Sequence, residues 1–117
     1  MNVLLVDDDP VSRETIKLFL QTKLCHVEEA AGGKQAVIEA LRVQPDLILM
    51  DLIMPDMDGV EAIRILKSMS WTKTIKFFAI TASEKPDLHD AALEAGADVV
   101  LGKPFDLEEF GRLAGIA

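Results

Sequence analysis

Four short apolar runs in this chain each lead to a polar residue that is able to do chemistry. The runs and the residues after them are Val3 to Val6 before Asp7 and Asp8, Leu47 to Met50 before Asp51, Phe77 to Ile80 before Thr81, and Val99 to Leu101 before Gly102 and Lys103. Almost purely aliphatic runs of this length are typical of strands in a parallel sheet covered on both faces. The carboxyl ends of such strands lie along one edge, where open α/β folds place their ligand sites.

Longer amphipathic segments separate the apolar runs, so that strand-like and helix-like segments alternate five times along the chain. This alternation predicts one α/β domain with a parallel sheet and helices on both faces. We place strands at Val3 to Val6 (central), His26 to Ala30 (a half-exposed edge), Asp46 to Met50, Lys76 to Ile80 and Asp98 to Leu101. We place helices at about Pro10 to Leu24, Lys34 to Val43, Val60 to Met69, Lys85 to Glu94 and Leu107 to Ala114.

Helical spacing also predicts which side chains of the first two helices face inward. After Asp9, a favoured helix N-cap residue, the first helix is expected to bury Val11, Thr15, Leu18, Phe19 and Thr22. The second helix is expected to bury Ala36, Val37, Ala40 and Leu41.

Composition excludes several functional classes. The 117 residues suffice for one hydrophobic core, and a net charge of −8 without a Lys or Arg cluster argues against direct binding of nucleic acid. The first residues form neither a secretory signal nor a membrane span, so we expect a soluble, cytoplasmic protein. The single cysteine, Cys25, has no partner for a disulfide or a thiolate metal site and is expected to pack in the core, while His26 and His89 are expected to be incidental.

The polar residues at the predicted strand ends suggest a metal-dependent reaction. Two aspartates about 5 Å apart repel each other by roughly 3 kcal/mol at an effective dielectric near 20, so Asp7, Asp8 and Asp51 require a counter-charge. Mg²⁺ suits such a shallow set of oxygen ligands. With the ammonium of Lys103 and the hydroxyl of Thr81 nearby, phosphoryl transfer at a carboxylate fits this set best.

Four segments, LLVDDDP, DLILMDLIMPDMDG, AITA and AGADVVLGKPF, span nearly the whole chain in this order. They resemble the receiver domain of two-component response regulators, the CheY-like family. The resemblance implies a single receiver domain over residues 1–117, with a (βα)5 flavodoxin-like fold and strand order 2-1-3-4-5.

The resemblance also implies a role for each site residue. Asp51 would be the phosphoacceptor, and Mg²⁺, with Mn²⁺ as a possible substitute, would be held by Asp7, Asp8, Asp51 and the backbone carbonyl of Ile53. Thr81 and Lys103 would contact the phosphoryl oxygens. The Lys103–Pro104 peptide bond would be cis, an isomer that X-Pro bonds tolerate.

In such a domain, a histidine kinase or histidine phosphotransfer protein donates the phosphoryl group from a phosphohistidine to Asp51. The domain would thus catalyse its own phosphorylation and dephosphorylation without being a conventional enzyme. Movement of Thr81 toward the phosphoryl group would alter the face formed by the fourth helix, fifth strand and fifth helix, which an unidentified output partner or a second copy in a phosphorylation-dependent homodimer would read. The end of the chain just after the last helix favours, by a small margin, a free-standing regulator.

Three positions bear on how this switch would work. Val100 stands where many family members carry an aromatic residue that moves with the threonine, so that coupling is in question for this chain. Ile53 and Ser83 occupy the two places that the resemblance links to phosphoryl lifetime. An apolar Ile53 is expected to hinder an attacking water and to lengthen the life of the phosphoaspartate.

Two alternatives belong to other functional classes. Asp7 to Val11 also fits the DxDx[TV] pattern of haloacid-dehalogenase-type phosphatases, with Asp7 as nucleophile and Asp9 as general acid, but this leaves Asp51 idle and lacks a later acidic strand end. A receiver fold that binds partners independently of phosphorylation is the second alternative.

Overall fold

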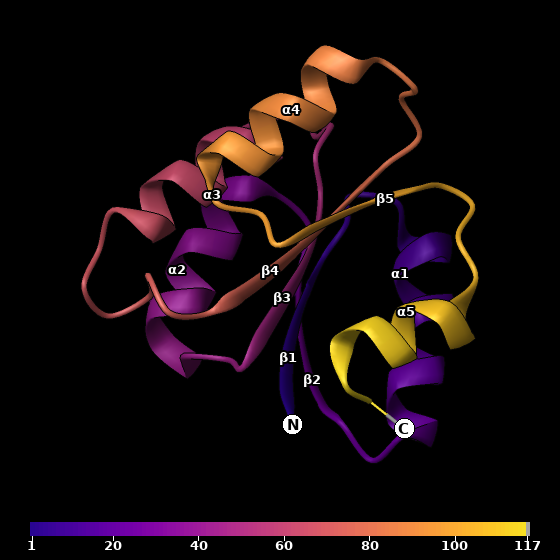
Figure 1. Cartoon of the computed structure of the whole chain (residues 1–117). Coiled ribbons are helices and arrows are strands. Elements are labelled where there is room, and N and C mark those ends of the chain that lie inside the picture. Colours follow the sequence, from indigo (N-terminus) through magenta and orange to yellow (C-terminus); the bar gives the residue numbers. More distant parts are fainter. Residues whose placement is uncertain (117) are drawn as a thin grey trace.

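The computed structural model describes residues 1–116, which contain a five-stranded sheet flanked by helices (Figure 1). The strands are β1 (Asn2–Val6), β2 (His26–Ala30), β3 (Leu47–Asp51), β4 (Lys76–Thr81) and β5 (Val99–Gly102). All neighbouring pairs are parallel and the order is β2-β1-β3-β4-β5, as the family resemblance implied. β1 lies inside the sheet, but the middle strand is β3, which is buried along its whole length.

Five helices connect the strands and cover both faces of the sheet. They are α1 (Pro10–Thr22), α2 (Gly33–Val43), α3 (Gly59–Lys67), α4 (Pro86–Ala95) and α5 (Leu107–Ala114). Figure 1 shows α1 and α5 on one face and α2, α3 and α4 on the other. The predicted number, type and order of elements are confirmed, with ends that differ by a few residues.

The two faces have separate cores because successive side chains of a strand point to opposite sides. Under α2, α3 and α4 the core is mainly aliphatic, and Leu4, Val6, Ile48 and Met50 belong to it. Under α1 and α5 the buried ring of Phe110 lies 5.8 Å from that of Phe78, 5.9 Å from Phe105 and 6.3 Å from Phe19, measured between ring centroids. Apolar side chains on both faces of the sheet are therefore buried under helices.

The predicted inward face of α1 is wrong for four of its five residues, and only Phe19 of that set packs, half-buried, against the core. Ile16 and Leu20 are buried, whereas Val11 is 74% exposed and Thr15, Leu18 and Thr22 are also exposed. In a helix with 100° per residue, Val11 and Ile16 point about 140° apart, so the helix cannot bury both stripes against one sheet. In α2, Ala36 and Ala40 are buried as predicted, but Leu41 is exposed.

Local features near the helix ends agree better with the sequence. The Asp9 carboxylate accepts a hydrogen bond from the Val11 backbone N–H and caps α1 as predicted. Cys25 is a free, buried side chain, which confirms its expected packing role. No helix within residues 1–116 is long and apolar enough to cross a bilayer.

Candidate functional site

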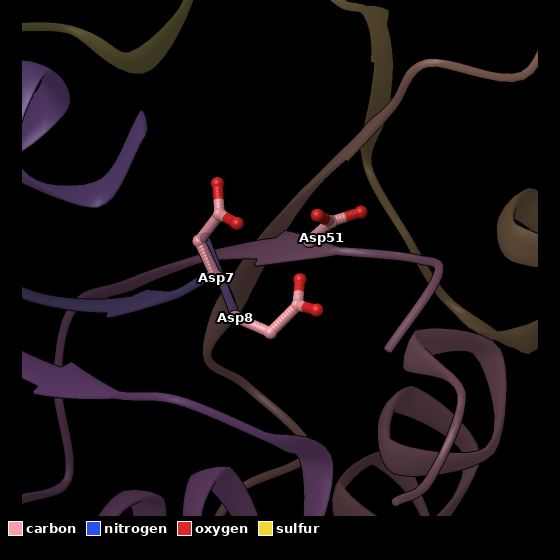
Figure 2. Close-up of side chains that lie close together, drawn as sticks. All are labelled: Asp7, Asp8 and Asp51. Atoms are coloured by element: carbon pink, nitrogen blue, oxygen red, sulfur yellow. The ribbon is translucent and has the colours of Figure 1, made fainter. Parts of the chain in front are cut away.

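Strand register brings the predicted site residues to one edge of the sheet. Val6 of β1 pairs with Met50 of β3, so Asp7 and Asp51 follow at the same level. One carboxylate oxygen from each of Asp7, Asp8 and Asp51 lies within 4.8 Å of the others, and Figure 2 shows these side chains gathered at the ends of β1 and β3. The predicted convergence of the three aspartates is confirmed.

Lys103 supplies the positive charge of this cluster. Its Nζ lies 2.8 Å from Oδ2 of Asp7 and 3.2 Å from Oδ2 of Asp51, and its side chain is 20% exposed. The Lys103 backbone N–H donates to the Thr81 carbonyl at 2.7 Å, and the peptide bond to Pro104 is cis, as the resemblance implied. The ammonium thus bridges two aspartates that come from different strands.

The two bridged aspartates have opposite pKa shifts. For Asp7, burial alone would raise the pKa, but hydrogen bonds from the Lys103 ammonium and the Asp9 backbone N–H outweigh it, so the pKa is lowered. For Asp51, burial dominates and raises the pKa, although the Ile53 backbone N–H donates to its Oδ1 at 3.1 Å and Lys103 lies close. Both carboxylates raise the pKa of Lys103 against the opposing effect of its burial.

Together these shifts describe a site that is held in a charged state at some energetic cost. Asp7 is fixed as an anion by its partners, whereas the Asp51 carboxylate is the less well stabilised charge of the pair. A hard cation that binds both groups would relieve this imbalance, and three carboxylates within one small volume match the oxygen ligands of Mg²⁺. The donor set therefore fits the predicted metal.

Thr81 lies at the carboxyl end of β4, where it pairs with Gly102 of β5. Its side chain is fully buried, and its Oγ1 accepts a hydrogen bond from the Ser83 backbone N–H at 3.0 Å. The structure thus places the hydroxyl at the predicted edge of the sheet and ties it to the loop that follows the strand.

The other predicted positions lie around this edge. Ile53 is 57% exposed and lies two residues after Asp51, the last residue of β3. Val100 lies in β5 and packs, half-buried, against the core that α2, α3 and α4 cover. The predicted roles of Ile53, Ser83 and Val100 in lifetime and switching stay predictions.

Two supporting contacts escaped the sequence analysis. The Asp56 carboxylate accepts hydrogen bonds from the backbone N–H groups of Gly33 and Lys34, at 3.0 and 3.1 Å, and so ties the β3–α3 loop to the start of α2. A Cβ atom on Gly32 would lie 2.7 Å from Asp56 Oδ1, so a larger residue there would have to displace this carboxylate. In the sequence, the Gly32–Gly33 pair could have indicated that another segment packs closely here, but not that this segment carries Asp56.

The second contact involves His89, which was expected to be incidental. Its Nε2 lies 2.9 Å from the Ser83 carbonyl oxygen, so this α4 residue contacts the loop that begins at Thr81. A histidine on a helix surface carries no sequence signal for a partner six residues earlier in a loop.

Comparisons with known proteins agree with this geometry. The family model for the response regulator receiver domain matches residues 3–113. The histidine-protein kinase BarA of Escherichia coli K12 is 35% identical over 113 residues, which cover 97% of this chain and 12% of the kinase. The chain thus spans about an eighth of that relative's length.

Two solved structures are also similar. The receiver domain of the sensor histidine kinase PA1611 from Pseudomonas aeruginosa, which has a magnesium ion coordinated in its active site cleft, is 34% identical with a TM-score of 0.89, over 97% of this chain and 93% of that one. The Saccharomyces cerevisiae structure of the histidine phosphotransfer protein Ypd1 with the receiver domain of Ssk1 gives 25% identity and a TM-score of 0.89, over 97% and 86% of the two chains. This chain belongs to the response regulator receiver domain family of two-component systems.

Proposed function

We propose that Asp51 accepts a phosphoryl group from the phosphohistidine of a histidine kinase or phosphotransfer protein. The observation that carries this proposal is the convergence of Asp7, Asp8 and Asp51 within 4.8 Å, with Lys103 bridging two of them. The complex of the Ssk1 receiver domain with Ypd1 supports the class of partner.

Asp7, Asp8 and Asp51 would hold Mg²⁺, together with the backbone carbonyl of Ile53. A bound divalent cation supplies charge neutralisation for the phosphoryl oxygens. The magnesium ion in the related PA1611 receiver domain supports this choice. Mn²⁺ is a plausible substitute because it also prefers oxygen ligands.

The chain's own residues supply the nucleophile and a fixed positive charge. A carboxylate oxygen of Asp51 forms the new bond to phosphorus while the bond from phosphorus to the donor's imidazole nitrogen breaks and the electron pair stays on that nitrogen. The ammonium of Lys103, which lies 3.2 Å from Asp51, faces the negative charge that the transferred oxygens carry. Hydrolysis of the phosphoaspartate returns Asp51 to its carboxylate form.

Phosphorylation adds charge and acceptor oxygens next to β4. The Thr81 hydroxyl would turn toward them and alter the β4–α4 loop, and the face formed by α4, β5 and α5 would present the change to an output partner. A phosphorylation-dependent homodimer and a cytoplasmic location stay predictions.

The alternative phosphatase reading lacks support. It requires Asp9 as a general acid, but the Asp9 carboxylate caps α1 through the Val11 N–H. The family match places the chain with receiver domains. The second alternative is a receiver fold that binds partners independently of phosphorylation. The following experiment distinguishes it from a phosphoacceptor.

The decisive experiment is incubation with acetyl phosphate, with and without Mg²⁺, followed by measurement of intact mass. The native chain should gain one phosphoryl group only when Mg²⁺ is present, and Asp51→Asn should gain none. Asp46→Asn is a matched control, because Asp46 accepts a hydrogen bond from Asn2 at the opposite ends of the strands. An unchanged native mass, or equal labelling of Asp51→Asn, would refute the assigned acceptor.

A second measurement addresses Ile53. If its apolar side chain hinders an attacking water, Ile53→Asn should shorten the life of the phosphoaspartate while labelling still occurs. A native lifetime of seconds or less would contradict this role for Ile53.

A further inference from the structure

Ser83 in the β4–α4 loop has hydrogen-bond partners for its backbone N–H, its Oγ and its carbonyl oxygen. Its backbone N–H donates to Thr81 Oγ1 at 3.0 Å, and its Oγ accepts from the Lys85 backbone N–H at 3.2 Å. Its carbonyl oxygen lies 2.9 Å from Nε2 of His89. The carbonyl can only accept, so the His89 ring carries a proton on Nε2.

These contacts form a continuous path from the site to a helix. The path runs from the Thr81 hydroxyl through the backbone N–H and carbonyl of Ser83, in two successive peptide groups, to the ring of His89, one turn into α4. Figure 1 shows the loop rising from the end of β4 to the start of α4. No side chain caps the N-terminus of α4, so the His89 bond is a side-chain tie from the helix back to this loop.

The neighbouring strand offers no comparable polar link. The three half-buried side chains of β5, Val99, Val100 and Leu101, are aliphatic and have no hydrogen-bonding group. The Thr81 hydroxyl is therefore linked to α4 through Ser83, which contacts the N-cap residue Lys85 through its Oγ and the helix side chain of His89 through its carbonyl.

We propose that His89 is a positioning residue that holds the β4–α4 loop in the arrangement seen here and couples Thr81 to α4. This inference rests on the proposed function, because it concerns how that site is regulated. When the Thr81 hydroxyl moves toward a phosphoryl group, its hydrogen bond pulls the Ser83 N–H in the same direction. The hydrogen bond from His89 holds the Ser83 carbonyl in place. A loop that follows Thr81 has to stretch or break the His89 bond, so this bond opposes the phosphorylated arrangement.

The first test uses the protein without a phosphoryl donor. Hydrogen exchange of the Ser83 amide should quicken about two- to tenfold in His89→Leu, because loss of the His89 bond to the Ser83 carbonyl makes opening of the loop easier by about the free energy of one hydrogen bond. His89→Gln should restore slow exchange, because its amide nitrogen can donate in place of Nε2. His26→Gln is the matched control, since His26 is exposed on the edge strand β2. An exchange rate of the Ser83 amide in His89→Leu equal to that of the native chain would show that His89 does not hold the loop.

The second test measures coupling to the site with beryllium fluoride, a mimic of a phosphoryl group, titrated in the presence of Mg²⁺. His89→Leu should bind it about two- to tenfold more tightly than the native chain, with His89→Gln and His26→Gln close to native. Equal affinity in the native chain and His89→Leu would overturn the coupling. The proposed function fails if the native chain does not bind beryllium fluoride, or if Asp51→Asn binds it equally well. The exchange experiment then still tests whether His89 holds the loop.

Discussion

The sheet faces and the carboxyl edge of the same strands are built in opposite ways. Under α1 and α5 the buried side chains are apolar, and three phenylalanines surround a fourth, Phe110. At the carboxyl edge lie three of the four polar or charged side chains that are buried within residues 1–116, namely Asp7, Asp51 and Thr81. One region excludes polar groups, and the other concentrates them.

This difference shows where stability and function reside. Burial of apolar area stabilises the fold without regard to direction. The edge instead holds like charges together, with Lys103 as their partner, so its charges offset one another only in part. The rigid faces allow the edge to keep an arrangement that is unfavourable by itself.

The largest effect is expected from the aromatic core. Phe110→Ala should lower the free energy of unfolding by about 4 kcal/mol, because a fully buried ring leaves a cavity. Urea denaturation measures this loss. Magnesium affinity of the folded variant should stay close to native, and a variant that loses less than about 1 kcal/mol would show that the core can collapse around the gap.

A smaller loss is expected at the edge. Lys103→Met should lower the free energy of unfolding by about 2 kcal/mol, because the fully buried Asp7 loses its ionic partner. The loss is less than for a completely buried pair, since Lys103 is 20% exposed. Urea denaturation with and without Mg²⁺ tests this: the cation should restore part of the loss, whereas a purely steric effect would not respond to it.

The raised pKa of Asp51 predicts how magnesium binding depends on pH. A protonated carboxyl cannot hold the cation, so affinity should fall as the pH drops through this raised pKa, by up to about tenfold per pH unit. The fall should begin at a higher pH than for an ordinary aspartate of pKa about 3.9. Calorimetric titrations over a pH series measure it, and a fall confined to the ordinary range would contradict the shift.

The smallest effects separate the two aspartates. Because burial raises the pKa of Asp51, its anion is less stable in the folded state, and Asp51→Asn should increase the free energy of unfolding without Mg²⁺. The pKa of Asp7 is lowered, so its anion stabilises the fold above the unfolded pKa, and Asp7→Asn should destabilise. Urea denaturation at neutral pH tests this. If both variants change the free energy of unfolding in the same direction, the assigned difference between Asp7 and Asp51 is contradicted.

Much of this architecture was predictable because it depends on local patterns. Aliphatic runs, the helical segments between them and the cap at Asp9 depend on neighbours within a few residues. The parallel arrangement then follows from the alternation, and with it the meeting of Asp7, Asp51, Thr81 and Lys103 at one edge.

Other features escaped prediction because they depend on contacts between separate elements. The face of α1 that is buried depends on how the helix lies on the sheet. Its sequence has one stripe that contains Val11 and another that contains Ile16, and only the second is buried. The ties from Asp56 to Gly33 and from His89 to Ser83 join groups whose proximity no local pattern encodes.

The sequence by itself determined the fold, the set of reactive groups and the edge at which they meet, because strand polarity and periodicity are properties of the chain. Only the tertiary structure decided how those groups differ: Asp7 lies fully buried against Lys103, Asp51 is less well stabilised, and Thr81 is tied through Ser83 to His89. The physical reason is that burial and hydrogen bonding across elements set the stability of each charge and the position of each donor.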